Sequence, residues 1–380
     1  MTKAIARPPF RADHVGSLLR PPELLAARER LQKGDLSAED LRSIEDRCIR
    51  DAVAMQEALG LQAITDGEFR RAVYHVDFLS RLDGIEHRRT TWTGGDGMKF
   101  KSRSGEPIAQ QPPSMMVVAG KIRRVRPILV EHFAFLKSVT RRTPKMCVPT
   151  PGHLHLRAGR ASILEEVYPD LDEFWQDISR AIREELRDLY AAGCRYVQLD
   201  ETCFATLTDP AIRDEIRQRG ENPDALPAMY ARMINAIVAD RSADLTVVMH
   251  TCRGNFRSTW MASGAYDPVA ETVFQTVGVD GFFLEYDDER SGGFEPLRHV
   301  PRNRKVVLGL VSTKTGKLED KDELRRRIDE ASKYVPLENL GLSPQCGFAS
   351  TLHGNQLTHD DQRRKLELVV AVARAVWGTA

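Results

Sequence analysis

Four residues of the kinds that bind zinc stand at the ends of three short apolar segments. His250 and Cys252 follow LTVVM, Glu285 closes DGFFLE, and Cys346 follows NLGLSPQ. One imidazole, one carboxylate and two thiols make a tetrahedral zinc set. Structural zinc sites usually gather closely spaced cysteine pairs, whereas these residues are far apart in the chain. A metal held by them would therefore bind and activate a substrate.

Each of these side chains, taken singly, also has an ordinary structural explanation. A histidine that ends an apolar strand is often a hydrogen-bonded core residue, and cysteine is often a small buried one. His250 and Cys252, however, lie two positions apart and would share one face of a strand. Glu285 ends a wholly apolar run, where an unpaired carboxylate is costly to bury. From the residues alone, a metal site and ordinary core packing both stay open.

Eight apolar runs of strand length alternate with amphipathic helical patterns along the chain. Near-continuously apolar runs separated by helices are typical of parallel strands covered on both faces. Eight of them predict an α/β fold, a single (β/α)₈ TIM barrel, whose functional side chains stand at the strand ends. The predicted strands are 12–18, 62–67, 145–149, 195–200, 246–250, 281–285, 305–311 and 339–344. The predicted helices are 38–59, 171–192, 224–240, 320–334 and 359–376.

Residues 83–125 interrupt this alternation after the second predicted strand. The segment is rich in glycine, proline and charge, and TTWTGGDGMKF within it predicts a hairpin with a glycine-rich turn. We expect this long inserted hairpin or loop to form part of a lid or substrate wall, because βα loops lie at the catalytic face of a barrel. A mobile surface insertion is the alternative. Without an internal repeat or a clear linker, residues 1–380 are predicted to form one domain.

The composition is that of an ordinary globular protein. The 380 residues are 42% apolar and 29% charged, with a formal net charge of +1. This balance gives no electrostatic reason to bind nucleic acid or an anionic membrane. The N-terminal segment has no apolar signal-peptide core, and no stretch approaches the length of a membrane span. Six cysteines without a C-x-x-C pair fit a reducing compartment, so we predict a soluble cytoplasmic protein.

Several segments occur in the same order in a known family. The chain resembles the cobalamin-independent methionine synthases, specifically their catalytic C-terminal barrel and the short stand-alone relatives of that barrel. The resemblance runs nearly end to end and rests on HVGSLLRPPELL, TDGEFRR, VQLDE, the H-T-C and L-E sites, and PQCG. It implies Zn²⁺ as the cofactor, with His250, Cys252, Glu285 and Cys346 as its ligands.

The resemblance also implies a reaction and a mode of substrate binding. A thiol that binds zinc loses its proton and becomes a thiolate, which is the nucleophilic form. The implied reaction moves the methyl group from N5 of a methylated tetrahydrofolate to homocysteine and yields methionine. The family's amino-acid site corresponds to Gly16 and Ser17 for the carboxylate, and to Glu68 and Asp200 for the ammonium group. As plain rim residues, these acids would instead pair with arginines or cap helices.

The chain departs from the family pattern where the methyl donor would bind. The tryptophan that stacks on the pterin in full-length enzymes has no equivalent in PTPGHLHLRAG, and Arg157 lies near its place. The histidine expected after the seventh strand is also absent, and Lys314 is nearest to it. Lys121 and Arg123, in GKIRRVRP, resemble a folate-contacting stretch and equally fit a solvated basic face. The donor could therefore be methyltetrahydrofolate, another small molecule, or a protein that delivers the methyl group.

Three functions are compatible with these residues. The first is a zinc-dependent methyltransferase that makes methionine from homocysteine. The second is zinc-dependent alkyl transfer to another thiol, as in enzymes that add coenzyme M to epoxides. Coenzyme M has a sulfonate and no ammonium, so the paired acids Glu68 and Asp200 argue against it, while Arg70 and Arg71 argue for it. The third is a non-catalytic barrel that binds thiols.

Overall fold

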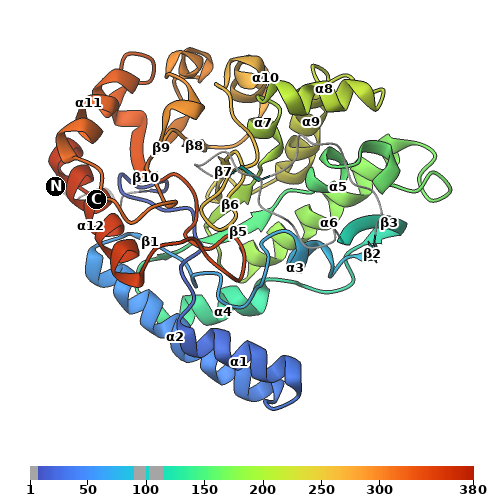
Figure 1. The fold of residues 1–380 in the computed structure, drawn as a ribbon, viewed down its shortest axis with the longest axis horizontal. Coiled ribbons are helices and arrows are strands. Elements are labelled where there is room, and N and C mark those ends of the chain that lie inside the picture. The colour runs from blue at the N-terminus through green and yellow to red at the C-terminus, as the bar shows by residue number, and fades with distance from the viewer. Residues whose placement is uncertain (1–6, 90–99, 102–113) are drawn as a thin grey trace.

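Six parallel strands form the central sheet of the protein. The computed structural model describes residues 7–89, 100–101 and 114–380. The sheet contains β5 (Met146–Pro149), β6 (Tyr196–Asp200), β7 (Thr246–Thr251), β8 (Gly281–Glu285), β9 (Lys305–Val311) and β10 (Leu340–Pro344). Each strand pairs with the next in chain order. Figure 1 shows these strands inside a ring of helices.

Short pairings supply the remaining two strand positions of the barrel. β1 (Ala63–Ile64) pairs in parallel with β4 (Thr143–Pro144), which lies one residue before β5. At the other edge, Ala12 forms a parallel bridge with Leu342 of β10. The predicted α/β barrel is confirmed by this arrangement, and all eight predicted strand positions lie in the predicted order.

The predicted strand at 12–18 is wrong beyond Ala12, where only that single bridge forms. The backbone after it is hydrogen-bonded by side chains in place of a neighbouring strand. Gln198 Nε2 donates to the Val15 carbonyl at 2.7 Å, and Thr65 Oγ1 donates to the Gly16 carbonyl at 2.6 Å. Gly16 itself has a φ of +129°, which a strand residue does not adopt.

Twelve α-helices lie among the described residues, and the five predicted ones are confirmed within three residues at each end. The predicted start of the last helix is a capping box, in which Thr358 and Asp361 bond each other's backbone N–H. The helices that the periodicity missed are shorter or carry weaker apolar stripes. The bounds are α1 (Pro22–Lys33), α2 (Ala38–Leu59), α3 (Val76–Leu79), α4 (Val130–Val139), α5 (His153–Leu156), α6 (Leu171–Ala191), α7 (Cys203–Thr206), α8 (Pro210–Gln218), α9 (Leu226–Val238), α10 (Asp267–Thr276), α11 (Lys321–Ala331) and α12 (His359–Trp377).

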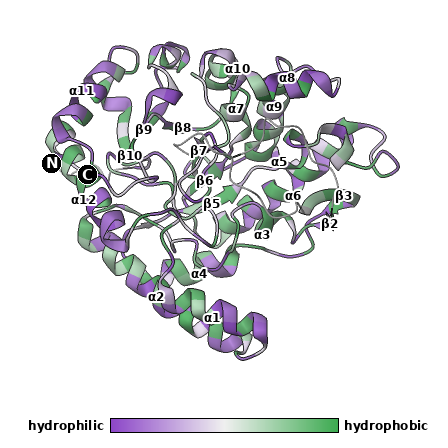
Figure 2. Ribbon diagram, in the orientation of Figure 1, coloured by the Kyte–Doolittle hydropathy of each residue, from purple (hydrophilic) through white to green (hydrophobic). Residues whose placement is uncertain are grey.

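Two apolar clusters stabilise the fold, one on each side of the strands. The larger lies between the strands and the helices, whose ribbons alternate between hydrophobic and hydrophilic residues in Figure 2. The smaller fills the barrel interior, because every second strand residue points inward. The interior cluster consists of Phe10, Val15, Ala63, Tyr196, Val248, Phe283 and Val307. The polar residues at the carboxyl ends of the strands lie above this interior cluster.

The segment that interrupts the alternation begins and ends as an antiparallel pair, β2 (Asp83–Arg89) and β3 (Ser114–Arg123). The Ile122 N–H donates to the Tyr168 hydroxyl at 2.7 Å, which fixes β3 beside the end of the β5–α6 connection. The predicted TTWTGGDGMKF hairpin lies outside the described residues except for Phe100. Among the described residues, no helix is long and apolar enough to span a membrane.

Candidate metal and substrate site

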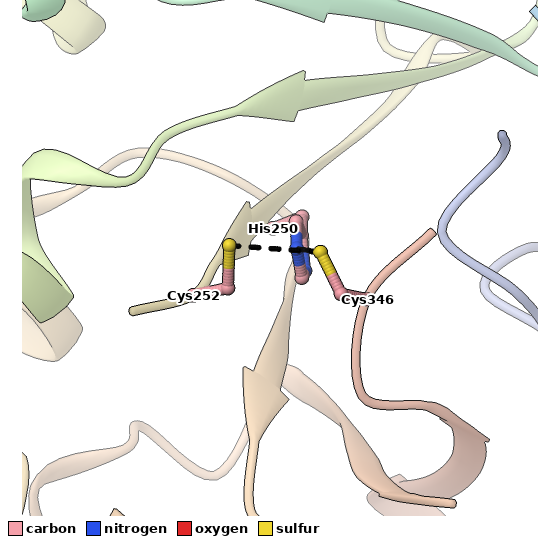
Figure 3. A group of neighbouring side chains, drawn as sticks. All are labelled: His250, Cys252 and Cys346. Atoms are coloured by element: carbon pink, nitrogen blue, oxygen red, sulfur yellow. Dashed lines mark hydrogen bonds between the residues drawn. The ribbon is translucent and has the colours of Figure 1, made fainter. Parts of the chain in front are cut away.

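Three side chains at the carboxyl ends of strands converge on one point. His250 lies in β7, Cys252 directly follows that strand, and Cys346 follows β10. Their ligand atoms all lie within 4.8 Å of one another, and Figure 3 shows the three side chains gathered at one place. All three are buried. We call these residues the metal group.

The spacing inside the metal group matches the edges of a zinc tetrahedron. Cys346 Sγ lies 3.5 Å from His250 Nε2 and 3.7 Å from Cys252 Sγ. Zinc bonds of about 2.3 Å to sulfur and about 2.0 Å to nitrogen place the ligand atoms about 3.5–3.8 Å apart. The residues present therefore fit zinc in both donor type and separation.

The protonation of the metal group suits a cation as well. Hydrogen bonds with Cys252 and His250 hold the pKa of Cys346 well below its ordinary value, although burial opposes them. Burial lowers the pKa of His250, but its hydrogen bond to Cys346 and the charge on that sulfur outweigh burial. The pKa of His250 is therefore raised above its ordinary value. Both shifts favour negative charge on the Cys346 sulfur, which is the form that binds a metal cation.

Glu285, the predicted fourth ligand, lies outside the group of three. Its buried carboxylate accepts the Arg253 backbone N–H at 2.5 Å, and it pairs with Arg290 at 2.5 Å and Lys314 at 3.2 Å. Burial raises the pKa of Glu285, but the three nearby cations hold it well below its usual range. The carboxylate is therefore an anion already surrounded by positive charge.

The strand register nevertheless places Glu285 beside the metal group. Thr251 of β7 is opposite Leu284 of β8, so the residues that follow, Cys252 and Glu285, are neighbours. The charge of Glu285 also contributes to raising the pKa of both His250 and Cys252. A change of side-chain conformation at Glu285 is needed before it can join the three other ligands.

A second group of potential ligands lies beside the metal group at the barrel mouth. Ligand atoms of Glu68, Cys147 and Asp200 are within 4.8 Å of one another. Asp200 ends β6 and pairs in register with His250 of β7, so this acid group adjoins the metal group. The three residues line a cavity with about 50 Å³ of space for the centres of water-sized molecules. We call them, with this cavity, the acid pocket.

The two carboxylates are held in place before any ligand binds. Glu68 has a φ of +57°, which is rare for a residue other than glycine, and it forms a partly buried ion pair with Arg71. Asp200 accepts a hydrogen bond of 2.7 Å from Gln198 Nε2. Burial, and then the charge of Glu68, raises the pKa of Asp200 to about 7. A cationic group in the acid pocket would relieve this repulsion.

The predicted turn at Gly16 and Ser17 packs between the two groups. A Cβ at Gly16 would lie 2.5 Å from Cys147 Sγ and 2.8 Å from Glu68 Oε1, so a side chain there would enter the acid pocket. Ser17 Oγ accepts the Ala349 N–H at 3.3 Å, and this contact fixes the turn against the loop that carries Cys346. All four predicted amino-acid-binding residues therefore lie at one end of the barrel.

The four predicted donor-binding residues separate into two pairs. Lys121 pairs with Glu173 and Arg123 with Asp83, and the side chains of these two cations are 47% and 75% exposed. Their surroundings are those of a solvated face. Lys314 is buried against Glu285, whereas Arg157 follows α5 and makes no hydrogen bond or ion pair with any described residue.

Sequence reasoning missed Cys147, Gln198 and Arg290, which contact the predicted site residues. Cys147 could have been found from strand alternation, because it shares an inward face with Lys145, a buried residue that pairs with Asp13. Gln198 likewise lies two residues before Asp200 on one face of β6. Arg290 follows β8 in an irregular segment, and no periodic pattern predicts its direction.

Comparison with known proteins gives a consistent result. The family model for the catalytic domain of cobalamin-independent synthases matches residues 10–375. The protein YxjG of Bacillus subtilis, itself uncharacterized, is 46% identical over 98% of this chain and 96% of its own length. A 5-methyltetrahydropteroyltriglutamate–homocysteine methyltransferase of Cronobacter sakazakii is 27% identical over 88% of this chain, which spans 40% of that longer protein.

A solved structure extends the match to three dimensions. A Listeria monocytogenes protein, assigned provisionally to the vitamin-B12 independent methionine synthases, superposes with a TM-score of 0.75. It is 38% identical, and the match covers 97% of this chain and 98% of the other. With the barrel, the two groups of polar side chains and these matches together, the chain belongs to the cobalamin-independent methionine synthase family.

Proposed function

We propose that this protein is a zinc-dependent S-methyltransferase that methylates homocysteine to methionine. The observation that carries the proposal is the adjacency of the metal group and the acid pocket, which the β6–β7 register sets side by side. When bound, zinc would lower the pKa of the substrate thiol and keep its sulfur nucleophilic.

The chain's own residues would then bind and orient the amino acid. Glu68 and Asp200 carry the negative charge that an α-ammonium group requires, and both lie at the acid pocket. The turn at Gly16 and Ser17 would present backbone N–H groups to the carboxylate. A thiol held at both ends has a fixed direction, so positioning supplies a large part of the rate. Cys147, between the acids, narrows the pocket.

His250, Cys252 and Cys346 are proposed as zinc ligands, and Glu285 as the fourth. Because Glu285 is paired with Lys314 and Arg290, it would be a weak and displaceable ligand. The methyl donor is proposed to be 5-methyltetrahydrofolate or its polyglutamate, the substrate named for the Cronobacter relative. Delivery of the methyl group by a second protein is the alternative source.

Zinc X-ray absorption on the purified protein tests this proposal. We expect a first shell of two sulfurs with nitrogen and oxygen, and one additional sulfur after homocysteine is added. Coenzyme M, which lacks the ammonium group, serves as the comparison thiol and should leave the spectrum unchanged. A gain of sulfur with coenzyme M but not with homocysteine would move the protein to the epoxide-opening class. Protein that cannot be loaded with zinc would refute the proposal.

A further inference from the structure

A cluster of polar side chains beside the metal group takes no part in the chemistry proposed so far. Tyr74, His75, His153, Thr202 and Arg157 come from three loops at the carboxyl ends of β1, β5 and β6. His75 and His153 are stacked, with ring centroids 4.6 Å apart and planes 22° apart. His153 Nε2 bonds the Thr202 hydroxyl at 2.6 Å and the Tyr74 hydroxyl.

The loop that carries Cys346 fixes this cluster next to the metal group. Val73 forms an antiparallel bridge with Thr351, and the Tyr74 N–H donates to the Ser350 carbonyl at 3.4 Å. Ser350 Oγ lies 3.9 Å from Cys346 Sγ. Burial and then the charge of Cys252 raise the pKa of Tyr74, which is consistent with this proximity.

Arg157 is the only cation of the cluster, and nothing described neutralises it. It lies four residues after His153, so the two side chains leave α5 on the same side. Its Nε is shielded from solvent and has no hydrogen-bond partner among the described residues. Arg157 is half-buried, so its guanidinium loses part of its hydration, at Nε, without a compensating contact in the described part of the chain. An anion that bound there would restore both hydrogen bonds and charge balance.

The two histidines would add neutral donors to the same anion. His75 and His153 are 9% and 6% exposed, and the Nδ1 atom of each is buried without a partner in the described part of the chain. Burial lowers the pKa of His153 to about 3, so its ring is neutral. The hydroxyls of Tyr74 and Thr202 both lie at Nε2 of His153, where they can donate to an unprotonated nitrogen. This favours the tautomer of His153 with its proton on Nδ1, and the Nδ1–H is then free to donate to a ligand.

We propose that Arg157, His75 and His153 form a binding site for an oxyanion, namely a carboxylate carried by one of the two substrates. The identity of that substrate rests on the proposed function, whereas the oxyanion site itself does not. The methyl donor is the favoured source, because Gly16, Ser17, Glu68 and Asp200 already account for the amino acid. The carboxylates of a pteroylglutamate chain have the required chemistry.

The site itself is tested by anion binding, without reference to activity. Sodium formate should raise the Tm of the wild-type protein by about 1–3 °C relative to sodium chloride of equal ionic strength. Arg157→Gln should abolish this difference, and Arg157→Lys should keep part of it. Arg325→Gln, at an exposed arginine of α11, is the matched control and should behave as wild type. An equal response to formate in Arg157→Gln and wild type would overturn the proposal.

Steady-state kinetics then identify the source of the carboxylate. Arg157→Gln should raise KM for 5-methyltetrahydropteroyltriglutamate about tenfold or more and leave KM for homocysteine within about twofold. The reverse pattern would assign the oxyanion to the amino acid, while unchanged KM values for both would refute a substrate site. If even the wild-type protein transferred no methyl group, the proposed function would fail, and the formate measurement would still decide the site.

Discussion

The three carboxylates of this site have opposite electrostatic surroundings. Glu68 and Asp200 share the acid pocket, where their mutual repulsion favours a bound cation. Glu285 is more deeply buried than either, but cationic side chains surround it and hold its pKa low. One carboxylate pair therefore suits an ammonium ligand, whereas the other carboxylate is already satisfied. This difference is why Glu285 would be the weakest of the proposed zinc ligands.

Replacing one sulfur of the metal group should remove zinc and leave the barrel intact. Cys346→Ser exchanges a thiolate for a hydroxyl that zinc binds poorly, so we expect zinc content to fall at least tenfold and methyl transfer to vanish. Elemental analysis and circular dichroism measure the two properties. Cys194→Ser is the control, because Cys194 is a buried thiol whose one hydrogen bond among the described residues goes to the Tyr196 carbonyl. Full zinc content in Cys346→Ser would refute the ligand assignment.

Asp200→Asn should weaken homocysteine binding and spare the zinc. Loss of a charged partner for the ammonium group is expected to raise KM for homocysteine about 10- to 100-fold, since Glu68 remains. Zinc content should equal that of wild type. Asp244→Asn, at an exposed acid that pairs with Arg195, is the control. An unchanged KM would show that Asp200 does not contact the substrate.

The raised pKa of Asp200 predicts a pH dependence of ligand binding. With a pKa of about 7, the carboxylate is mostly ionised at pH 8 and mostly protonated at pH 6. An ammonium group requires the ionised form, so affinity should fall about tenfold from pH 8 to pH 6. Methionine is the ligand to titrate by calorimetry, because it has no thiol that ionises in this range. Asp200→Asn should bind methionine weakly at both pH values.

At the scale of elements, the strands position the site, and the sequence predicts them well because their composition is simple. β6, β7 and β8 are mostly apolar, and polar residues at or next to their ends, namely Asp200, His250 and Glu285, were predicted to face the barrel mouth. Residues 12–18 have a similar pattern but form no strand beyond Ala12. Side chains distant in sequence, such as Gln198, satisfy that backbone, and a local pattern cannot contain this information.

The turn at Gly16 provides a test of how an irregular element shapes the pocket. Gly16→Ala would place Cβ against Cys147 and Glu68 at a φ of +129°. We expect a loss of about 2–4 kcal/mol in the free energy of unfolding, together with weaker homocysteine binding. Gly34→Ala is the matched control, because Gly34 also has a positive φ but no atom within 4 Å of the added Cβ. It should cost only about 1 kcal/mol. Equal losses in urea unfolding would show that the close approach at Gly16 is unimportant.

At the scale of the whole molecule, the metal group lies above the apolar interior and contributes little to it. Phe283 and Val248 fill the barrel below the strand ends, while the larger cluster lies outside the strands. Zinc fingers unfold without metal because they have no comparable core. The sequence already indicated a substrate-binding metal site in place of a structural one, because the four proposed ligands are far apart in the chain. The direction of Glu285 was not predictable, because it depends on Arg290 in the irregular segment after β8 and on Lys314 in the loop after β9.

Removal of zinc should therefore leave a folded barrel that no longer responds to homocysteine. After dialysis against a chelator, we expect an unchanged far-ultraviolet circular dichroism spectrum and a Tm only a few degrees lower. Saturating homocysteine, at about 100 times its Kd, should add about 2.7 kcal/mol to the stability of the zinc form and much less to that of the apo form. Methionine, whose ammonium group would contact the acid pocket but whose sulfur is a poor ligand, should stabilise both forms nearly equally. If the apo protein lost its secondary structure, zinc would be part of the fold, and the separation of core from site argued here would be wrong.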